Sequence, residues 1–165
     1  MQRLKQLVLA VSLVLVFGYA AYEVYTKERT IREGELILLR LAPVDPRSLM
    51  QGDYMELRYA ISTEAEAPPR RGFLVLARDE RGVGRFVRVQ AGREPLRTGE
   101  HLIRFVRRSA GAGQTGRLSI GAEQFFFQEG RAERFAGARY GGLRLDGRGG
   151  SVLVGLYDED ARLIR

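Results

Sequence analysis

The stretch PVDPRSLMQGDYMELRY, residues 43–59, joins a run of turn-forming residues to the start of a strand. Asp45 is a strong helix N-cap, and Pro46 follows it at the first helical position, which predicts a single helical turn there. Gly52 permits a backbone conformation that is closed to other residues. Asp53 can accept hydrogen bonds from nearby amides and so set a turn. The stretch therefore predicts a tight turn that leads into a core strand.

The strand expected after this turn covers residues 54–61, where apolar and polar side chains alternate. Side chains in a strand point to opposite faces in turn, so this pattern predicts one buried face and one outward face. The buried face is expected to carry Met55, Leu57, Tyr59 and Ile61, and the outward face Tyr54, Glu56 and Arg58.

Further β-type runs alternate with turns rich in Gly, Pro and Asp along the rest of the chain. We expect strands at residues 35–41, 72–78, 85–89, 102–106, 118–120, 143–145 and 151–157. The turn at 79–82 predicts a hairpin, and the Gly/Ala/Ser-rich segment 109–116 predicts a mobile loop. Helical spacing over 132–140 predicts one short α-helix. The expected fold is mainly β, barrel-like or a sandwich, with that one helix.

Residues 6–22 form an uncharged, apolar run that shows no polar face at helical spacing. Such a run is typical of a membrane-spanning helix, since Lys5 can snorkel to the interface and the tyrosines that end the run suit the interfacial layer. We therefore expect the bilayer to be one partner of the chain. The predicted division is a basic leader at 1–5, a signal-anchor helix at 6–25, a charged linker at 26–34 that Gly34 ends, and a β-rich domain at 35–165.

A cleaved signal peptide is the alternative, because Arg3 and Lys5 form a basic leader and residues 18–20 offer a small-x-small site. The basic residues on the two sides of the run nearly balance, so charge gives little help on orientation. A short leader before a long folded domain favours a cytoplasmic N-terminus. We expect a single-pass inner-membrane protein with a periplasmic or other extracytoplasmic domain.

Composition excludes several classes of site. The chain has a net charge of +7, no cysteine and one histidine. Disulfides, thiolate metal sites and histidine-rich zinc sites are therefore ruled out, and neither a metal nor a cofactor is expected. The positive charge would suit a nucleic acid. We expect none, because the strand arginines line solvent faces without an aromatic stacking platform and an extracytoplasmic domain would not meet that ligand.

The segment 43–59 resembles the GDYXXLXY family, named for its pattern. The residues that carry this resemblance are Asp45, Pro46, Arg47, Gly52, Asp53, Tyr54, Leu57 and Tyr59. A second block of similarity falls in 121–130 and just beyond, with Glu123, Phe126, Glu129 and Glu133. The resemblance covers most of the chain and implies a bacterial membrane-anchored protein whose gene accompanies multi-spanning membrane proteins. It implies no reaction and no catalytic residue.

Two classes of function remain. The first is a non-enzymatic interaction module that acts with a multi-spanning membrane partner. The second is a cell-envelope hydrolase that uses paired carboxylates, Asp53 with Asp45 or the Glu123/Glu129/Glu133 group, for general acid–base chemistry. A Ser-Lys protease is disfavoured because both lysines lie in the N-terminal segment, and a Ser-His-Asp triad would depend on the lone His101.

Overall fold

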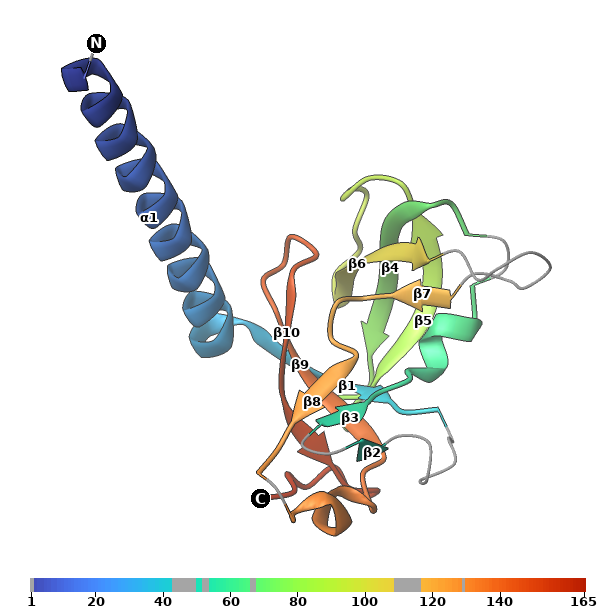
Figure 1. The fold of residues 1–165 in the computed structure, drawn as a ribbon. Helices are drawn as coiled ribbons and strands as arrows, with labels where there is room; N and C mark the ends of the chain where they lie inside the picture. The colour runs from blue at the N-terminus through green and yellow to red at the C-terminus, as the bar shows by residue number, and fades with distance from the viewer. Residues whose placement is uncertain (1, 43–49, 52–53, 66–67, 109–116, 129) are drawn as a thin grey trace.

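A computed structural model of the chain describes residues 2–42, 50–51, 54–65, 68–108, 117–128 and 130–165 (Figure 1). The one long helix of this part is α1, Gln2–Glu33. The strands are β1 Glu35–Arg40, β2 Met50–Gln51, β3 Tyr54–Glu56, β4 Arg71–Arg78, β5 Gly84–Gln90, β6 Glu100–Arg108, β7 Arg117–Ser119, β8 Gln124–Phe126, β9 Tyr140–Leu145 and β10 Ser151–Tyr157. Two 3₁₀ turns complete the list, η1 Ala60–Thr63 and η2 Ala132–Phe135.

The strands form three antiparallel sheets, with the orders β1-β9-β10, β2-β3-β8 and β5-β4-β6-β7. Within the described residues these sheets do not close into a barrel. The prediction of a mainly β domain behind one apolar N-terminal helix is confirmed.

All three sheets contribute to one hydrophobic core. The largest fully buried side chains of this core are Tyr59, Phe105, Ile37, Leu39, Leu74, Leu76, Ile103, Leu118, Leu143 and Leu156. The turn that follows β4 joins two of the sheets directly, because the amide of Leu38 donates to the carbonyl of Gly82 at 2.9 Å. At Gly84 a Cβ would lie 3.1 Å from Leu39, so a glycine allows this close approach.

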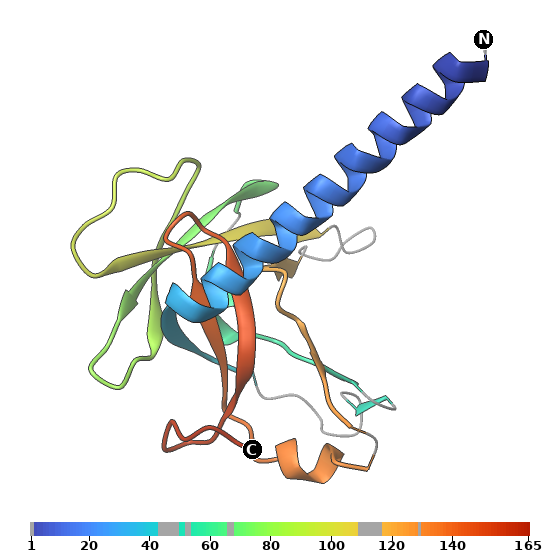
Figure 2. The same ribbon diagram turned by 90° about the vertical axis from the view of Figure 1, so that its left-hand side faces the viewer.

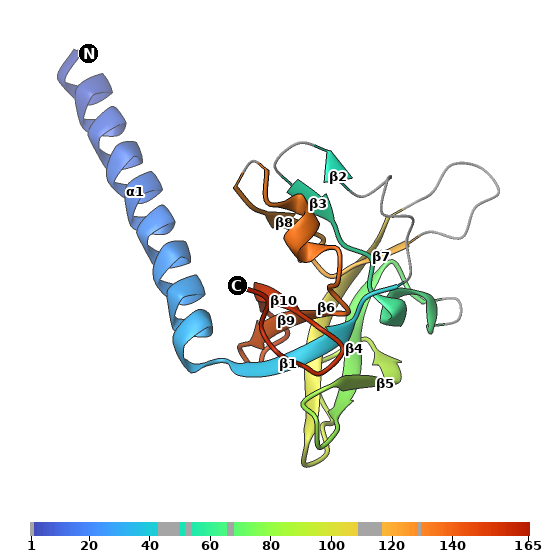
Figure 3. The same ribbon diagram turned by 90° about the horizontal axis from the view of Figure 1, so that it is seen from below.

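The helix α1 stands apart from the β domain over most of its length and enters it through β1 (Figure 3). Its last turn is tied down: Thr30 is buried, and the amide of Gly34 donates to the Thr30 carbonyl at 2.9 Å. The guanidinium of Arg144 in β9 donates to the Gly34 carbonyl at 2.6 Å. A Cβ at Gly34 would lie 2.8 Å from the carbonyl oxygen of Leu145, so this junction requires glycine. The expectation that Gly34 ends the helix is confirmed.

The strand expected over 54–61 is shorter than the sequence suggests. Its ladder ends at Glu56, and η1 begins at Ala60. The buried face is nevertheless as expected, because Met55, Leu57, Tyr59 and Ile61 are all buried. Alternating burial therefore continues past the end of the hydrogen-bonded ladder.

The prediction of a short α-helix over 132–140 is wrong, because these residues form a 3₁₀ turn followed by the start of a strand. Residues Ala132–Phe135 form a 3₁₀ turn whose N-cap, Arg131, makes no side-chain capping bond. Tyr140 already belongs to β9, and it is buried together with Phe135. Both rings are buried, but Phe135 is buried from a tight turn and Tyr140 from a strand.

The hairpin expected around residues 79–82 is confirmed by the pairing of β4 with β5. Asp79 accepts the amides of Arg81 and Val83, and Gly82 has a positive φ of 81°. The same backbone amides lower the pKa of Asp79, that of Val83 most. The helical turn expected after Asp45 and the loop expected at 109–116 lie outside the described residues.

Candidate functional site

The structure describes only the last part of the motif that lies within residues 43–59. Tyr54, Leu57 and Tyr59 are in the described residues. The motif residues Asp45, Pro46, Arg47, Gly52 and Asp53 lie outside them. The site is therefore built from the strand that follows the turn and from the elements packed against it.

Tyr59 is the most enclosed residue of the motif, with 2% of its surface exposed. Its hydroxyl donates to the carbonyl oxygen of Ala122 at 2.7 Å. Its ring lies against Gly141 of β9, where a Cβ would come within 2.9 Å of the ring carbon Cε1. Tyr59 also forms an antiparallel bridge with Leu41, so this one residue joins β9, the end of the first strand and the second block. Burial raises the pKa of its hydroxyl well above the usual range.

The second block meets the motif through its backbone. The amide of Leu57 donates to the Glu123 carbonyl at 2.7 Å, and β8 continues this contact as an antiparallel ladder with β3. The Glu123 carboxylate turns back and accepts the amides of Ile120 and Gly121. Gly121 has a positive φ of 80°, which the turn between β7 and β8 requires. The Glu123 side chain therefore holds the turn that presents Ala122 to Tyr59.

The outer face of the same ladder carries two aromatic rings. Tyr54 pairs with Phe126, and their ring centroids lie 6.0 Å apart. Phe126 is 69% exposed, whereas its neighbour Phe125 turns inward and packs edge-on against Phe135 with centroids 5.0 Å apart. Tyr54 and Phe126 are called the outer aromatic pair below.

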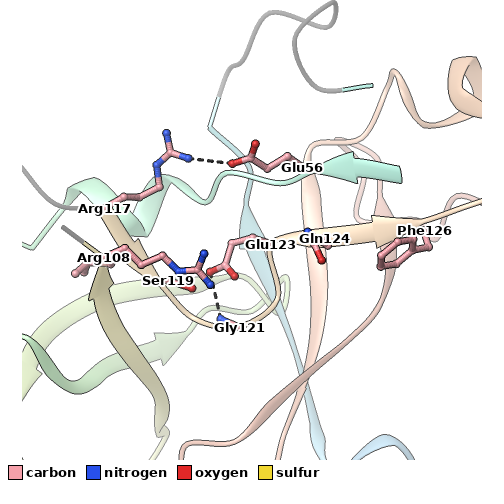
Figure 4. Close-up of a pocket in the computed structure, with 9 residues that line it drawn as sticks. Glu56, Arg108, Arg117, Ser119, Gly121, Glu123, Gln124 and Phe126 are labelled. Carbon is pink, nitrogen blue, oxygen red and sulfur yellow. Dashed lines mark hydrogen bonds and ion pairs between the residues drawn. The ribbon is translucent and has the colours of Figure 1, made fainter. Parts of the chain in front are cut away.

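An open groove of about 560 Å³ lies beside Phe126 (Figure 4). Phe126 lines it at one end, and Glu56 and Arg117, which form an ion pair at 3.1 Å, line it as well. Arg108 and Glu123 also line this groove. The groove thus combines an aromatic edge with side chains of both charges, which suits polar contacts around an apolar anchor.

The model of the GDYXXLXY protein family matches residues 16–156. The chain belongs to this family. The match includes the last part of the apolar run of α1, the motif and the second block. No curated protein and no solved structure matches the chain.

In this GDYXXLXY protein the described residues of the pattern fall into two groups, one buried and one at the surface. Leu57 and Tyr59 are buried, and they contact the second block through the Leu57 amide and the Tyr59 hydroxyl. Tyr54 lies at the surface edge and contacts Phe126. The motif and the second block, far apart in the sequence, therefore form one continuous structure.

The carboxylates considered for hydrolysis are only partly described. Asp45, Asp53 and Glu129 lie outside the described residues. Glu123 uses its Oε1 atom to hold two amides, and Glu133 is exposed on η2. Among the described residues no three His, Cys, Asp or Glu side chains gather as a metal site would need. His101 of β6 lies 3.5 Å from Glu35, the first residue of β1.

Two features of the site are not evident from the sequence. Ala122 takes part through its carbonyl oxygen, and a backbone group carries no side-chain signature. The pairing of Glu56 with Arg117 joins β3 to β7, and only the tertiary fold brings these strands together. For the Glu56–Arg117 pair, the sequence indicated only that Glu56 points outward from the alternating strand.

Proposed function

We propose that this GDYXXLXY protein is a non-enzymatic interaction module, held at a membrane by α1, that docks on an extramembrane segment of a multi-spanning membrane protein. The observation that carries the proposal is the exposure of Phe126. Among the described residues after α1, the next most exposed large hydrophobic side chain is Leu163, at 44% against 69%. Exposed aromatic side chains with a polar rim are typical of protein interfaces.

The strand arrangement supports the same surface. β8 is an outer strand of the sheet β2-β3-β8, so one of its edges has no strand partner among the described residues. An outer strand can pair with an extended segment of another protein through its main chain, while alternate side chains give specificity. Phe126 and the charged groove beside it would supply those side-chain contacts.

The membrane part of the proposal rests on α1. This helix is long and apolar enough to cross a bilayer, and its apolar window is entirely exposed. We propose the division into leader 1–5, span 6–25, linker 26–34 and domain 35–165, with the N-terminus cytoplasmic and the domain extracytoplasmic. A partner that also spans the bilayer is favoured because both proteins are confined to the same surface, which raises their effective concentration. A topology reporter fused after Arg165 tests the orientation, and a cytoplasmic signal from it would contradict the proposal.

The docking surface is tested by site-specific photo-crosslinking of the full chain in native membranes. A photoreactive residue at position 126 is expected to give a discrete adduct with a protein that has several membrane spans, identified by mass spectrometry. The control position is Val87 on β5, an exposed apolar residue of another sheet, and it should give no such adduct. Copurification should be lost with Phe126→Ser and retained with Val87→Ser.

Three outcomes would contradict the proposal. They are the absence of an adduct at position 126, the same adduct from both positions, and an adduct with the mass of two copies of this chain. The last would mean that the surface binds a second copy instead of a different membrane protein.

A further inference from the structure

A second hollow adjoins the groove beside Phe126 and shares Arg108, Ser119 and Gly121 with it. It has a volume of about 420 Å³ and is bounded by α1, β6, the β7–β8 turn and the tip of the β9–β10 hairpin. Figure 2 shows the β9–β10 hairpin beside the last turns of α1. We call this hollow the basic pocket.

Three cationic side chains line the basic pocket: Lys27 of α1, and Arg104 and Arg108 of β6. The two arginines point the same way because they occupy alternating exposed positions on one strand. None of the residues that line the pocket is a carboxylate. The charge of the pocket is therefore of one sign.

Within the described residues, several carboxylates near the pocket have partners of their own. Glu123 accepts the amides of Ile120 and Gly121, and Asp146 accepts the amides of Arg148 and Gly150. Glu28 and Glu33 of α1 pair with Arg32 and Arg29. No described carboxylate forms an ion pair with any of the three basic side chains of the pocket. The pocket cations thus have no charge partner in this part of the chain, and an anion would supply one.

The wall opposite the helix is fixed by backbone contacts. The amide of Arg104 donates to the Gly149 carbonyl at 2.8 Å, which docks the hairpin tip on β6. Gly149 has a positive φ of 93° and lies against the ring of Phe73, so no side chain fits there. The Arg104 guanidinium lies 6.0 Å from the centroid of the same ring. The pocket is therefore shaped before any ligand arrives.

The depth of the pocket in the membrane follows from the position of Lys27. It comes two residues after the proposed span ends at Tyr25, which is about 3 Å of helix rise. The polar layer on each side of a bilayer is about 5–7 Å thick. Lys27, and with it the basic pocket, therefore lies at the level of the lipid phosphates.

We infer that the basic pocket binds the phosphate of an anionic membrane lipid, with Lys27, Arg104 and Arg108 as its cationic contacts. Arginine matches phosphate geometry through parallel hydrogen bonds, and lysine acts as a point charge. The site rests on the membrane anchoring proposed above but not on the docking partner, since a lipid is the only ligand it needs.

The test uses the full chain in nanodiscs of phosphatidylcholine mixed with phosphatidylglycerol, followed by native mass spectrometry of the lipids that remain bound. The wild-type chain should retain phosphatidylglycerol preferentially. Removing one basic residue from a membrane surface weakens anionic-lipid attraction by about fivefold. Arg104→Gln and Arg108→Gln should each reduce the preference by about that factor, and Arg104→Lys should restore part of it.

The matched control removes the same charge elsewhere. Arg131 and Arg134 are exposed on and beside η2, so Arg131→Gln and Arg134→Gln should leave the lipid preference unchanged. The inference is overturned if the pocket variants keep the wild-type preference or if the control variants lose it equally. It is also overturned if inorganic phosphate, titrated into the chain in pure phosphatidylcholine nanodiscs, binds at the same residues while no phosphatidylglycerol preference exists. Because no partner protein is present, failure here leaves the docking proposal to its own crosslinking test.

Discussion

Tyr59 and Tyr54 belong to the same motif, but their rings lie in different surroundings. Tyr59 is enclosed by β9 and the second block, and its hydroxyl is satisfied by a backbone carbonyl. Tyr54 is half-buried and leans on the exposed ring of Phe126. The buried residues Leu57 and Tyr59, the inner half of the motif, thus stabilise the fold. Tyr54, the outer half, is part of the surface. Changes in the two halves should therefore have different consequences.

The largest effect is expected from Tyr59→Ala. Replacing a fully buried aromatic residue by alanine removes apolar contacts and leaves a cavity, which typically lowers the free energy of unfolding by about 3–5 kcal/mol. Chemical denaturation of the full chain in detergent micelles measures this loss. Tyr54→Ala is the matched comparison and should cost less than about 1 kcal/mol. Equal losses at both positions would remove the distinction between the two halves.

Gly141→Ala tests the packing of the Tyr59 ring from the opposite side. The new Cβ would lie 2.9 Å from Cε1 and 3.0 Å from the hydroxyl oxygen of Tyr59, which its hydrogen bond holds in place. Overpacking of this kind costs about 1–3 kcal/mol in stability. Gly137→Ala is the control, because a Cβ there meets no atom within 4 Å. A neutral Gly141→Ala would mean that the ring can move freely.

Glu123→Ala tests whether this carboxylate is structural. Two backbone amides would lose a charged acceptor, and such hydrogen bonds at a half-buried site contribute about 1–2 kcal/mol to stability. The exposed Glu133→Ala should leave the denaturation midpoint unchanged. A Glu123→Ala chain as stable as wild type, but defective in a membrane phenotype, would instead favour a chemical role for Glu123.

The buried hydroxyl of Tyr59 also predicts a pH dependence. Burial raises its pKa, so the folded chain keeps the proton at a pH where the unfolded chain has lost it. The contribution is complete below the ordinary tyrosine pKa of about 10 and declines above it. At pH 11 the loss is about 1.4 kcal/mol. Denaturation midpoints of wild type and Tyr59→Phe between pH 9 and 11 measure it, and parallel curves would contradict the prediction.

The smallest change in stability is expected from Phe126→Ser. Because this ring is mostly exposed, its loss should change the free energy of unfolding by less than about 0.5 kcal/mol. The same variant should lose copurification with the proposed membrane partner. A large loss of stability would show that the outer aromatic pair serves the fold as well, and the division between the two halves would fail.

The sequence predicts the inner half of the motif better than the outer half. Alternation over 54–61 identifies the buried side of Tyr59, because burial on one face repeats every second residue. It does not reveal the end of the ladder at Glu56, since pairing depends on the short partner β8, which the sequence did not indicate as a strand. The exposure of Phe126 is equally hidden, because a run of three phenylalanines gives no sign of which ring turns outward.

The basic pocket could not be predicted from the sequence, for a different reason. Lys27 and the two arginines of β6 are far apart in the chain, and their charges are unremarkable among many others. Only the docking of the β9–β10 hairpin on β6 brings them around one hollow. By contrast, the apolar helix and its end at Gly34 are local properties, and the sequence predicts both correctly.

The junction at Gly34 gives the helix a mechanical role. α1 continues unbroken to Glu33, and its last turn is clamped by Thr30, Gly34 and the guanidinium of Arg144. A helix joined in this way acts as a lever, and membrane helices commonly tilt by about 20°. With α1 across the bilayer as proposed above, a change of tilt caused by a thicker bilayer or a neighbouring span would rotate the β domain through the same angle. The orientation of Phe126 toward its surroundings would then report the thickness of the membrane below it.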